Sequence, residues 1–547
     1  MNHVKLLDCT LRDGAYLLDK KFGNETISGI IKGLVETQID FIEIGFFQNA
    51  GFGDGKTVFR NSSDAKRFIP KDKKGCLFTV LADYSRYDVS NLDNCQSDSI
   101  DAIRECFFKH ERFEAIEACE KIKNKGYKVF IQPVDILGYS DKELIEFLDL
   151  VNQVEPECLS IVDTFGSMYQ EDLHRIFEII HHNLLPSCRI GFHSHNNMQL
   201  SNALSQEFIR LSTGRRNIVI DGTISGMGRG AGNTPTELIV EYVNTHINGN
   251  YDMDSLLDTI DIYMDNIRSK CSWGYSTPFF VAGCYGAHVN NIAYLTQKNS
   301  IKSKDIRYVL NKIGAQARKR YDYVLLENTY MDLMKSNIDD SEDLEKLRKC
   351  IHDRKILILV PGSSVVTEKE KILKFVENEN PIIIAVNFVP DYISADYIYT
   401  SNVRRFEYWR ANTEFEKALK IITSNIMEKS SDNKTYIISF TRLIKTGVWE
   451  HLDNSTILLL RLLDILNSRA IYIAGFDGYD YKTKNTSNYI SEDLELSSPA
   501  ENPVSRNIEI SDMLKEYMET RENKNVPISF ITPSRFENCL TNIVPYN

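Results

Sequence analysis

The stretch KLLDCTLRDGAY, residues 5–16, begins as a short apolar run and ends in charged residues around a glycine. Seven more apolar runs of strand length follow it, and amphipathic stretches of helical period separate them. Such alternation is typical of βα units on a parallel sheet. The eight runs are residues 5–11, 41–46, 76–82, 102–108, 128–134, 158–164, 189–195 and 217–223.

Eight strands with crossover helices favour a closed (β/α)8, or TIM, barrel over residues 1–250. The alternative is an open doubly wound sheet, which would usually carry a glycine-rich nucleotide turn after its first strand. The segment TLRDGAY (10–16) does not have that pattern. In a barrel, polar residues at the carboxyl ends of the strands face a common mouth, where barrel enzymes place their chemistry.

The rest of the chain divides into three further segments. Residues 251–334 have helical patterns and are expected to extend the barrel and complete its active site, while the charged stretch 335–355 is predicted to be a helical linker. Strand and helix patterns alternate again over 356–547, which indicates a Rossmann-like α/β domain. Its expected strands lie in 355–364, 381–389, 397–401, 435–440, 470–480 and 527–533, and 482–503 is expected to be a loop.

The composition excludes some functions. With 64 basic and 76 acidic residues the net charge is −12, so the overall field repels nucleic-acid backbones and anionic lipid, although a local basic pocket stays open. No run approaches the ~20 apolar residues of a membrane span, and the first residues lack an apolar signal core. We therefore expect a cytoplasmic protein without nucleic-acid or membrane partners. The 11 cysteines form no CxxC pair and are expected to be reduced.

Three polar clusters follow the first, seventh and eighth predicted strands. Residues i and i+2 of a strand share a face, so His193 and His195 present two imidazoles together. Only the eighth strand separates the first from the seventh in a closed barrel, so Asp13 can meet both. One carboxylate and two imidazoles suit Mn²⁺, Fe²⁺, Co²⁺ or Zn²⁺, and Asn233 would add a carbonyl oxygen after a glycine-rich turn. Each cluster alone has a simpler interpretation, namely packed polar residues or a solvated turn.

The motifs LDCTLRDGAY (7–16), FHSHNN (192–197) and GMGRGAGN (226–233) resemble those of the metal-dependent aldolase, lyase and Claisen-condensing barrels. That family includes 4-hydroxy-2-oxovalerate aldolase, hydroxymethylglutaryl-CoA lyase and isopropylmalate synthase. The resemblance covers roughly residues 3–295. It implies a divalent metal, Mn²⁺ foremost and otherwise Co²⁺, Mg²⁺ or Zn²⁺, and a homo-oligomer is expected. The ligands of that metal would be Asp13, His193 and His195, with Asn233 close to it.

The resemblance also implies roles for four more residues. Arg12 would bind the enolate oxygen of a 2-keto acid, although a salt bridge closing the barrel rim is the alternative. Thr164 would lie near the substrate carboxylate, or would cap the following helix together with Asp163. Tyr16 stands where the aldolases have a histidine, and His288 where they have a tyrosine. We therefore predict that Tyr16 and His288 form an acid-base pair in which the tyrosine and the histidine have exchanged positions. Alternatively, His288 could equally be a helix residue bonded to a carbonyl.

The function implied is a divalent-metal-dependent aldolase that cleaves or forms a 4-hydroxy-2-keto acid through a pyruvate-type enolate. Ala15 and Tyr16 replace the acidic or amide residues of the Claisen-condensing branch, and Gly230 follows Arg229 where that branch usually has a glutamate. These departures favour aldol chemistry, and an acyl-CoA-dependent Claisen acyltransferase stays an alternative.

The C-terminal domain adds a second alternative. VPGSS (360–364) follows a strand and precedes a helix, a place where backbone N–H groups can hold a phosphate. Gly475 and Asp477 end a later strand, as in nucleotide-sugar folds, although a tight structural turn explains them equally well. A nucleotide or nucleotide-sugar partner is therefore expected in this domain. The alternative of another class is a degenerate barrel carrying a glycosyltransferase-like or nucleotide-sugar-binding module.

Overall fold

A computed structural model describes residues 3–297, 301–334, 338–426, 434–445, 454–479, 489 and 503–540. The chain forms two compact units. Unit 1 comprises Met1–Ile292 and Gly314–Tyr321, and unit 2 comprises Ala293–Ile313 and Asp322–Asn547. The sequence predicts four consecutive segments with separate roles, namely 1–250, 251–334, 335–355 and 356–547. The roles of these segments stay a prediction.

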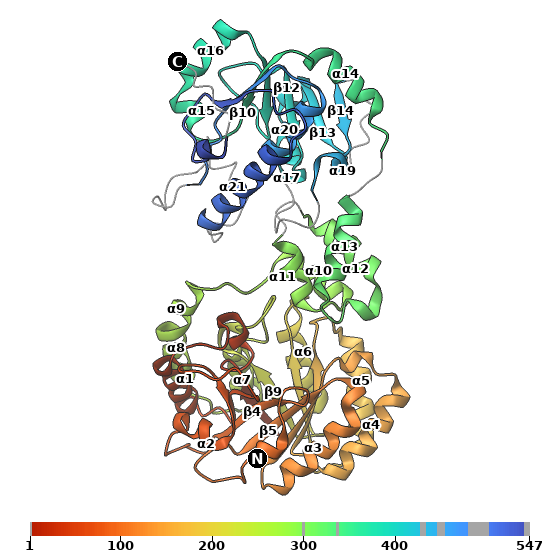
Figure 1. Ribbon diagram of the computed structural model, residues 1–547. Coiled ribbons are helices and arrows are strands. Elements are labelled where there is room, and N and C mark those ends of the chain that lie inside the picture. The colour runs from red at the N-terminus through yellow and green to blue at the C-terminus, as the bar shows by residue number, and fades with distance from the viewer. Residues whose placement is uncertain are drawn as a thin grey trace. The chain divides into compact units, whose positions relative to one another are not determined.

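Unit 1 contains the predicted eight-stranded parallel barrel (Figure 1). The first strand pairs with both the second and the last, which closes the sheet. A two-residue strand, β3 (Val58–Phe59), runs beside β2 and was not predicted. The barrel strands are β1 (Val4–Asp8), β2 (Phe41–Phe47), β4 (Leu77–Asp83), β5 (Ala102–Phe107), β6 (Lys128–Pro133), β7 (Cys158–Asp163), β8 (Arg189–Ser194) and β9 (Ile218–Gly222).

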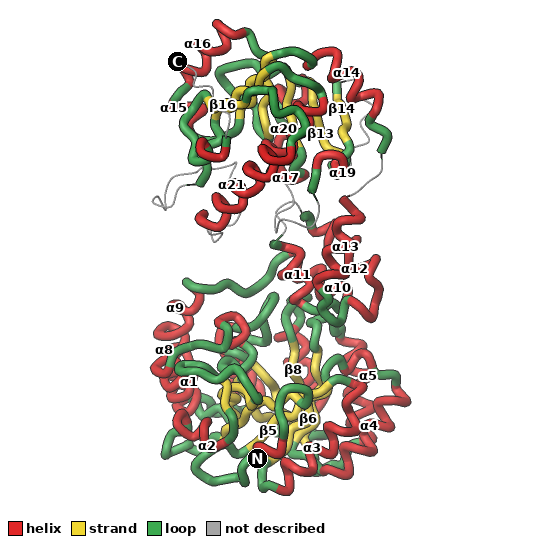
Figure 2. The backbone as a smooth tube through the Cα atoms, viewed as in Figure 1, coloured by secondary structure: helices red, strands yellow, loops and turns green. Residues whose placement is uncertain are grey.

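Helices surround these strands (Figure 2). Their apolar residues recur at helical spacing, so each helix buries one face against the sheet, as Ile27, Ile30, Ile31 and Leu34 do in the first. The outer helices are α1 (Asn24–Glu36), α3 (Arg112–Asn124), α4 (Asp141–Val154), α5 (Gln170–Asn183), α6 (Ser201–Ser212) and α7 (Thr236–Ile247), with the short α2 (Ser62–Ala65) between β3 and β4.

The first strand ends at Asp8, three residues earlier than the sequence predicts. The chain turns there because the backbone N–H groups of Arg12 and Asp13 both donate to the Cys9 carbonyl, at 3.1 and 2.8 Å. The 3₁₀ helix η1 (Gly14–Leu18) follows directly. This turn lifts Arg12 and Asp13 out of the strand and onto the mouth of the barrel.

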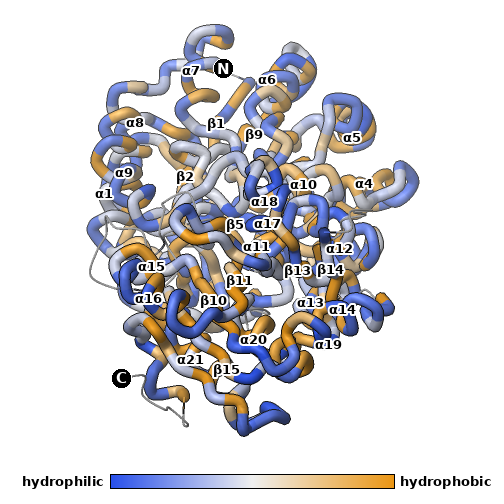
Figure 3. The backbone as a smooth tube through the Cα atoms, turned by 90° about the horizontal axis from the view of Figure 1, so that it is seen from above, coloured by the Kyte–Doolittle hydropathy of each residue, from blue (hydrophilic) through white to orange (hydrophobic). Residues whose placement is uncertain are grey.

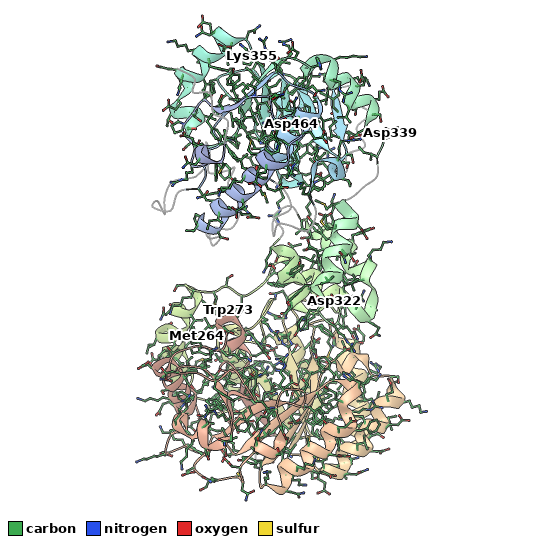
Figure 4. The ribbon with its side chains drawn as sticks, viewed as in Figure 1. Met264, Trp273, Asp322, Asp339, Lys355 and Asp464 are labelled. Atoms are coloured by element: carbon green, nitrogen blue, oxygen red, sulfur yellow. The ribbon has the colours of Figure 1, made fainter. Side chains whose placement is uncertain are left out.

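The segment after the barrel is helical, as predicted. The Trp273 indole N–H donates to the Ser225 carbonyl at 2.9 Å, in the loop after β9, and Met264 is buried nearby in sequence (Figure 4). The helices are α8 (Met253–Thr259), the π-helix η7 (Ile260–Met264), α9 (Asp265–Arg268), α10 (Thr277–Tyr285), α11 (Val289–Thr296), α12 (Ser303–Ala317), α13 (Tyr323–Met334) and α14 (Ser341–Ile351).

Unit 2 contains a parallel sheet in the order β14-β13-β12-β11-β10-β15-β16. The strand order reverses between β10 and β15. Strands β10 and β11 are runs of isoleucine and leucine that form the apolar centre (Figure 3). The strands are β10 (Lys355–Leu359), β11 (Ile382–Val386), β12 (Tyr397–Thr400), β13 (Leu419–Thr423), β14 (Thr435–Ile438), β15 (Ala470–Ala474) and β16 (Ile528–Phe530).

The parallel α/β architecture of unit 2 is confirmed, and its Rossmann-like classification stays a prediction. Strand β13 was missed because Lys420 interrupts its short apolar run. The predicted loop 482–503 lies outside the described residues except at 489 and 503. The described helices are α15 (Ser364–Thr367), α16 (Lys369–Glu379), α17 (Val403–Trp409), α18 (Thr413–Lys417), α19 (Phe440–Leu443), α20 (Ser455–Ile465) and α21 (Pro503–Thr520).

In the part of the chain that the structure describes, no helix combines the length and apolarity needed to cross a membrane. All 11 cysteines are free, as expected.

Candidate metal centre

Asp13, His193 and His195 meet at the mouth of the barrel, as predicted. The Asp13 Oδ2 atom lies 3.2 Å from His193 Nε2 and 3.3 Å from His195 Nε2. The three ligand atoms lie within 4.8 Å of one another. Asp13 and His193 are buried, while the side chain of His195 is 17% exposed. This cluster therefore opens to solvent on the His195 side.

The Nδ1 atoms of both imidazoles already form hydrogen bonds. His193 Nδ1 donates to Asp221 Oδ2 at 3.0 Å, and His195 Nδ1 donates to the Asp163 carbonyl at 2.9 Å. In the neutral rings both Nε2 atoms therefore carry lone pairs, which is the usual arrangement of metal-binding histidines. Two lone pairs facing a carboxylate oxygen repel it unless a cation lies between them.

Two buried oxygens in this cluster have no hydrogen-bond donor. These are Asp13 Oδ2 and Asn233 Oδ1, and no donor among the described residues forms a hydrogen bond with either atom. The Asn233 amide nitrogen donates to the Met227 carbonyl at 3.1 Å, which leaves the oxygen as its free end. Asn233 also pairs with His195 in an isolated antiparallel bridge. Buried oxygens without donors are rare, so the donor set fits a divalent cation.

A buried ionic network lies behind these residues. Glu43 Oε2 accepts from Arg12 Nε at 2.7 Å and from Arg104 Nη1 at 2.9 Å. Arg104 Nη2 also donates to Asp221. The two guanidinium groups and the three carboxylates of Asp13, Glu43 and Asp221 sum to 2 − 3 = −1. A divalent cation would change this charge to +1, which suits a monoanionic ligand.

The network also sets protonation states. Burial alone would raise the pKa of Asp13, but the charge of the Arg12 guanidinium holds that pKa well below its usual value. Arg12 is buried too, yet Glu43 and Asp13 raise its pKa. A carboxylate and a guanidinium thus stay charged side by side, and Arg12 acts as a fixed positive group. Its contact with Asp13, 3.3 Å from Nη1 to Oδ2, leaves it inside the site rather than on the rim.

Tyr16 lies under the guanidinium of Arg229. The Arg229 Cζ atom is 3.9 Å from the Tyr16 ring centroid, and Phe46 packs edge-on against the same ring at 5.3 Å. Burial raises the pKa of Tyr16, so its phenol keeps the proton at neutral pH.

His288 lies just before α11. Its Nδ1 accepts the backbone N–H of Asn290 at 3.1 Å, so its Nε2 carries the proton. Burial lowers its pKa to about 3, and the positive charge of Arg229 adds to this effect. The imidazole is therefore neutral, and Tyr16 and His288 both lie near Arg229. The alternative role of His288, a helix residue bonded to a carbonyl, agrees in part with the structure. The imidazole caps α11, and the His288 backbone N–H donates to the Arg318 carbonyl at 2.9 Å.

Thr164 follows β7, next to the carbonyl of Asp163 that holds His195. Its hydroxyl accepts the Asp135 backbone N–H at 2.7 Å, which leaves its own hydrogen free to donate. Asp163 Oδ1 accepts the N–H groups of Ser167 and Met168 at 2.9 and 3.2 Å. Asp163 therefore holds the turn before α5 rather than capping the helix itself, and Thr164 keeps a free hydroxyl hydrogen.

Comparisons with known proteins agree with this geometry. The HMGL-like family model matches residues 3–263. A 4-hydroxy-2-oxovalerate aldolase from Shewanella halifaxensis is 31% identical over 333 residues, which cover 57% of this chain and 92% of that protein. The chain belongs to the HMGL-like family.

Two further matches are more distant. An oxaloacetate decarboxylase from Mycobacterium tuberculosis is 26% identical over 240 residues, or 43% of this chain and 68% of that one. The solved structure of a Bacillus subtilis HMG-CoA lyase matches with 19% identity and a TM-score of 0.38, over 49% of this chain and 92% of that one. The HMGL-like chain described here is an enzyme of the carbon-carbon lyase type, a metal-dependent aldolase or lyase.

Sequence reasoning missed three residues of this HMGL-like centre: Glu43, Arg104 and Asp221. Each is a charged residue in the middle of an apolar strand, in FIEIGF, AIRECFF and NIVIDGT. A charge in a buried strand is rare unless it is paired, so these three residues were a usable signal.

The residues singled out in unit 2 form a closely packed structural contact. The Gly362 N–H donates to the Gly475 carbonyl at 3.0 Å, and a Cβ on Gly475 would lie 1.9 Å from the Val360 carbonyl. Asp477 Oδ2 accepts the Ser364 N–H at 2.8 Å, so a carboxylate already occupies the place considered for phosphate. The tight-turn interpretation therefore explains these glycines. Nucleotide or nucleotide-sugar binding stays a prediction, supported by the reversal of strand order between β10 and β15.

Proposed function

We propose that this HMGL-like enzyme is a pyruvate aldolase, which cleaves or forms a 4-hydroxy-2-keto acid and prefers Mn²⁺. The observation that carries the proposal is the gathering of two imidazole Nε2 atoms and two donor-free oxygens beside the guanidinium of Arg12. Asp13, His193, His195 and Asn233 would hold the cation, which when bound would polarise the keto group of the substrate.

The chain's own residues supply the remaining chemistry. In cleavage, the C4 hydroxyl loses its proton, the C3–C4 bond breaks to release an aldehyde, and its electron pair forms the enolate of pyruvate. Arg12 stabilises the charge on the enolate oxygen, since Glu43 fixes its guanidinium at 2.7 Å. Protonation at C3 completes pyruvate. Thr164 donates to the substrate carboxylate.

Tyr16 and His288 move the hydroxyl proton. Both carry a proton at neutral pH, so in aldol addition they can donate to the aldehyde oxygen as it becomes an alkoxide. In cleavage the step is the reverse, so Tyr16 must first release its phenol proton to solvent, a loss that the positive charge of Arg229 favours, before it accepts the C4 hydroxyl proton.

The test is pyruvate release from 4-hydroxy-2-oxovalerate by the full chain, coupled to NADH oxidation by lactate dehydrogenase. We expect Mn²⁺-dependent turnover that EDTA abolishes, and a loss of about 100-fold or more in kcat for Arg12→Lys because a shorter ammonium leaves the oxyanion without its oriented partner. Free thiol release from acetyl-CoA and a 2-keto acid, without aldol turnover, would contradict the proposal and favour Claisen chemistry. A chain that binds Mn²⁺ but turns over neither substrate would indicate a degenerate barrel.

A further inference from the structure

Basic side chains gather around the ring of Tyr16. Arg229 lies over the ring at 3.9 Å. Lys20 Nζ lies 5.8 Å from the same centroid and 4.7 Å from that of Phe46. Burial lowers the pKa of Lys20, and the positive charges of Arg86, Lys56 and Arg229 lower it further, while Asp19 partly offsets them.

Two of these cations have no anionic partner among the described residues. Lys20 Nζ donates to the neutral Gln48 Oε1 at 2.9 Å. Arg229 forms no ion pair with any described carboxylate, and its buried Nε atom has no hydrogen-bond acceptor. Arg86 differs, since its Nε lies 3.5 Å from Asp83 Oδ2. Half-buried cations that repel one another are costly unless an anion joins them.

The position of Arg229 is fixed relative to the metal centre. Arg229 and Asn233 belong to one glycine-rich turn, which the Ala231 N–H anchors to Asn197 Oδ1 at 3.1 Å. A Cβ on Gly230 would lie 2.8 Å from that same oxygen, so the turn packs closely. A Cβ on Gly230 would also lie 3.0 Å from Val289 Cγ1, so the residue that follows His288 packs against this turn.

We propose that Arg229 and Lys20 form an anion site that binds a phosphate or carboxylate on the aldehyde half of the substrate. This inference rests on the proposed function, because the first carboxylate of a 2-keto acid is already assigned to the metal centre and Thr164. The substrate class becomes a 4-hydroxy-2-keto acid with a second, distal anionic group. Guanidinium and ammonium groups bind phosphate and carboxylate alike, so the chemistry of the anion is decided by experiment.

The first experiment measures binding without turnover. The Mn²⁺-loaded full chain is titrated calorimetrically with glycerol 3-phosphate, with glycerate and with glycerol as the neutral probe. We expect at least one anion to bind ten times or more tightly than glycerol, and this preference to disappear in Arg229→Gln and in Lys20→Met. Arg229→Lys should restore part of it, and Arg215→Gln, which removes a guanidinium paired with Glu178 on the outside of the barrel, should leave it unchanged.

The second experiment measures aldol addition of pyruvate to matched aldehydes. Glyceraldehyde 3-phosphate is compared with glyceraldehyde, and succinic semialdehyde with butanal. The preferred anionic aldehyde should have a kcat/KM at least ten times that of its neutral partner, and Arg229→Gln should bring this ratio close to one through the KM of the anionic aldehyde.

Equal binding of anions and glycerol, or an equal loss on both aldehydes in Arg229→Gln, would overturn the anion site. Failure of the proposed function has another signature, namely no exchange of pyruvate C3 hydrogens with solvent in any variant. Glycerol 3-phosphate binding that depends on Arg229 would then still support the anion site, so the two failures are distinguishable.

Discussion

At the scale of single residues, the site depends on groups that never touch a substrate. Asp221 accepts from both His193 and Arg104, so one carboxylate orients a metal ligand and joins it to the ionic network. The candidate metal ligands could be predicted, because the spacing of His193 and His195 and the turn at Asp13 are local sequence features. Glu43, Arg104 and Asp221 become partners only when the barrel closes, so their pairing could not be deduced from the sequence.

Replacing Asp221 by asparagine should weaken Mn²⁺ binding about 10- to 100-fold, since His193 loses the carboxylate that fixes its ring and Arg104 loses a charge. Isothermal titration with MnCl₂ measures the change. The control is Asp252→Asn, an exposed helix-capping position where asparagine also caps. Equal Mn²⁺ affinity in Asp221→Asn and the parent would show that Asp221 does not support the ligand.

Glu105, the neighbour of Arg104 on β5, gives a pH test of stability. It is fully buried, and neither carboxylate oxygen has a described hydrogen-bond partner. Burial, with Asp83 and Glu111, raises its pKa well above the usual value of 4.5. Above pH 4.5 the folded chain therefore holds a proton that the unfolded chain releases, and stability falls as pH rises toward the folded pKa.

Glu105→Gln removes this titration, so the variant should lose less stability than the parent between about pH 5 and pH 8. Thermal unfolding at both pH values measures the difference, with a melting temperature at the higher pH expected to be a few degrees above that of the parent. Parallel pH dependence in the two proteins would contradict the assignment.

At the scale of elements, close backbone packing fixes the turn after β9, which carries the proposed ligand Asn233. Gly232 has φ +83°, and a Cβ there would lie 2.0 Å from the Gly226 carbonyl. All eight barrel strands could be predicted because each is a short buried apolar run. Strand β13 could not, since Lys420 breaks its pattern and the strand is recognisable only by its pairing with β12 and β14.

Gly232→Ala should therefore displace Asn233 and weaken Mn²⁺ binding by about tenfold, a ligand-orientation effect of the size seen for supporting residues. Gly214→Ala is the matched control, because Gly214 also has a positive φ, +71°, but a Cβ there would meet no atom within 4 Å. Both variants introduce the same kind of backbone strain, so only the steric contact separates them. Equal Mn²⁺ affinities would refute the role of this turn.

At the scale of the whole molecule, the chain leaves unit 1 after residue 292 and returns over residues 314–321. The returning segment holds the neighbourhood of His288. The Arg318 carbonyl accepts the His288 N–H at 2.9 Å and the Asn291 amide at 2.7 Å, and Lys319 pairs with Asp135 at 2.6 Å. The composition could not predict such a return, because its contacts lie between residues far apart in the sequence.

Two truncations test this dependence. A chain ending at residue 334 keeps the returning segment and should keep aldolase turnover within about threefold of the full chain, whereas one ending at residue 300 should lose at least tenfold more because His288 is released. Both are assayed for pyruvate release, and circular dichroism checks that the barrel is folded. Equal activity of the two truncated chains would show that residues 314–321 do not support the site.

The central claim is that Asp13, His193 and His195 hold a divalent cation at which pyruvate is converted to its enolate. The most direct measurement follows deuterium entering C3 of pyruvate in D₂O by NMR, with no aldehyde present, in the metal-free and Mn²⁺-loaded protein. We predict exchange that requires Mn²⁺ and disappears in His195→Ala, together with one Mn²⁺ bound per chain in the parent. Exchange at the same rate after metal removal, or in His195→Ala, would contradict the account.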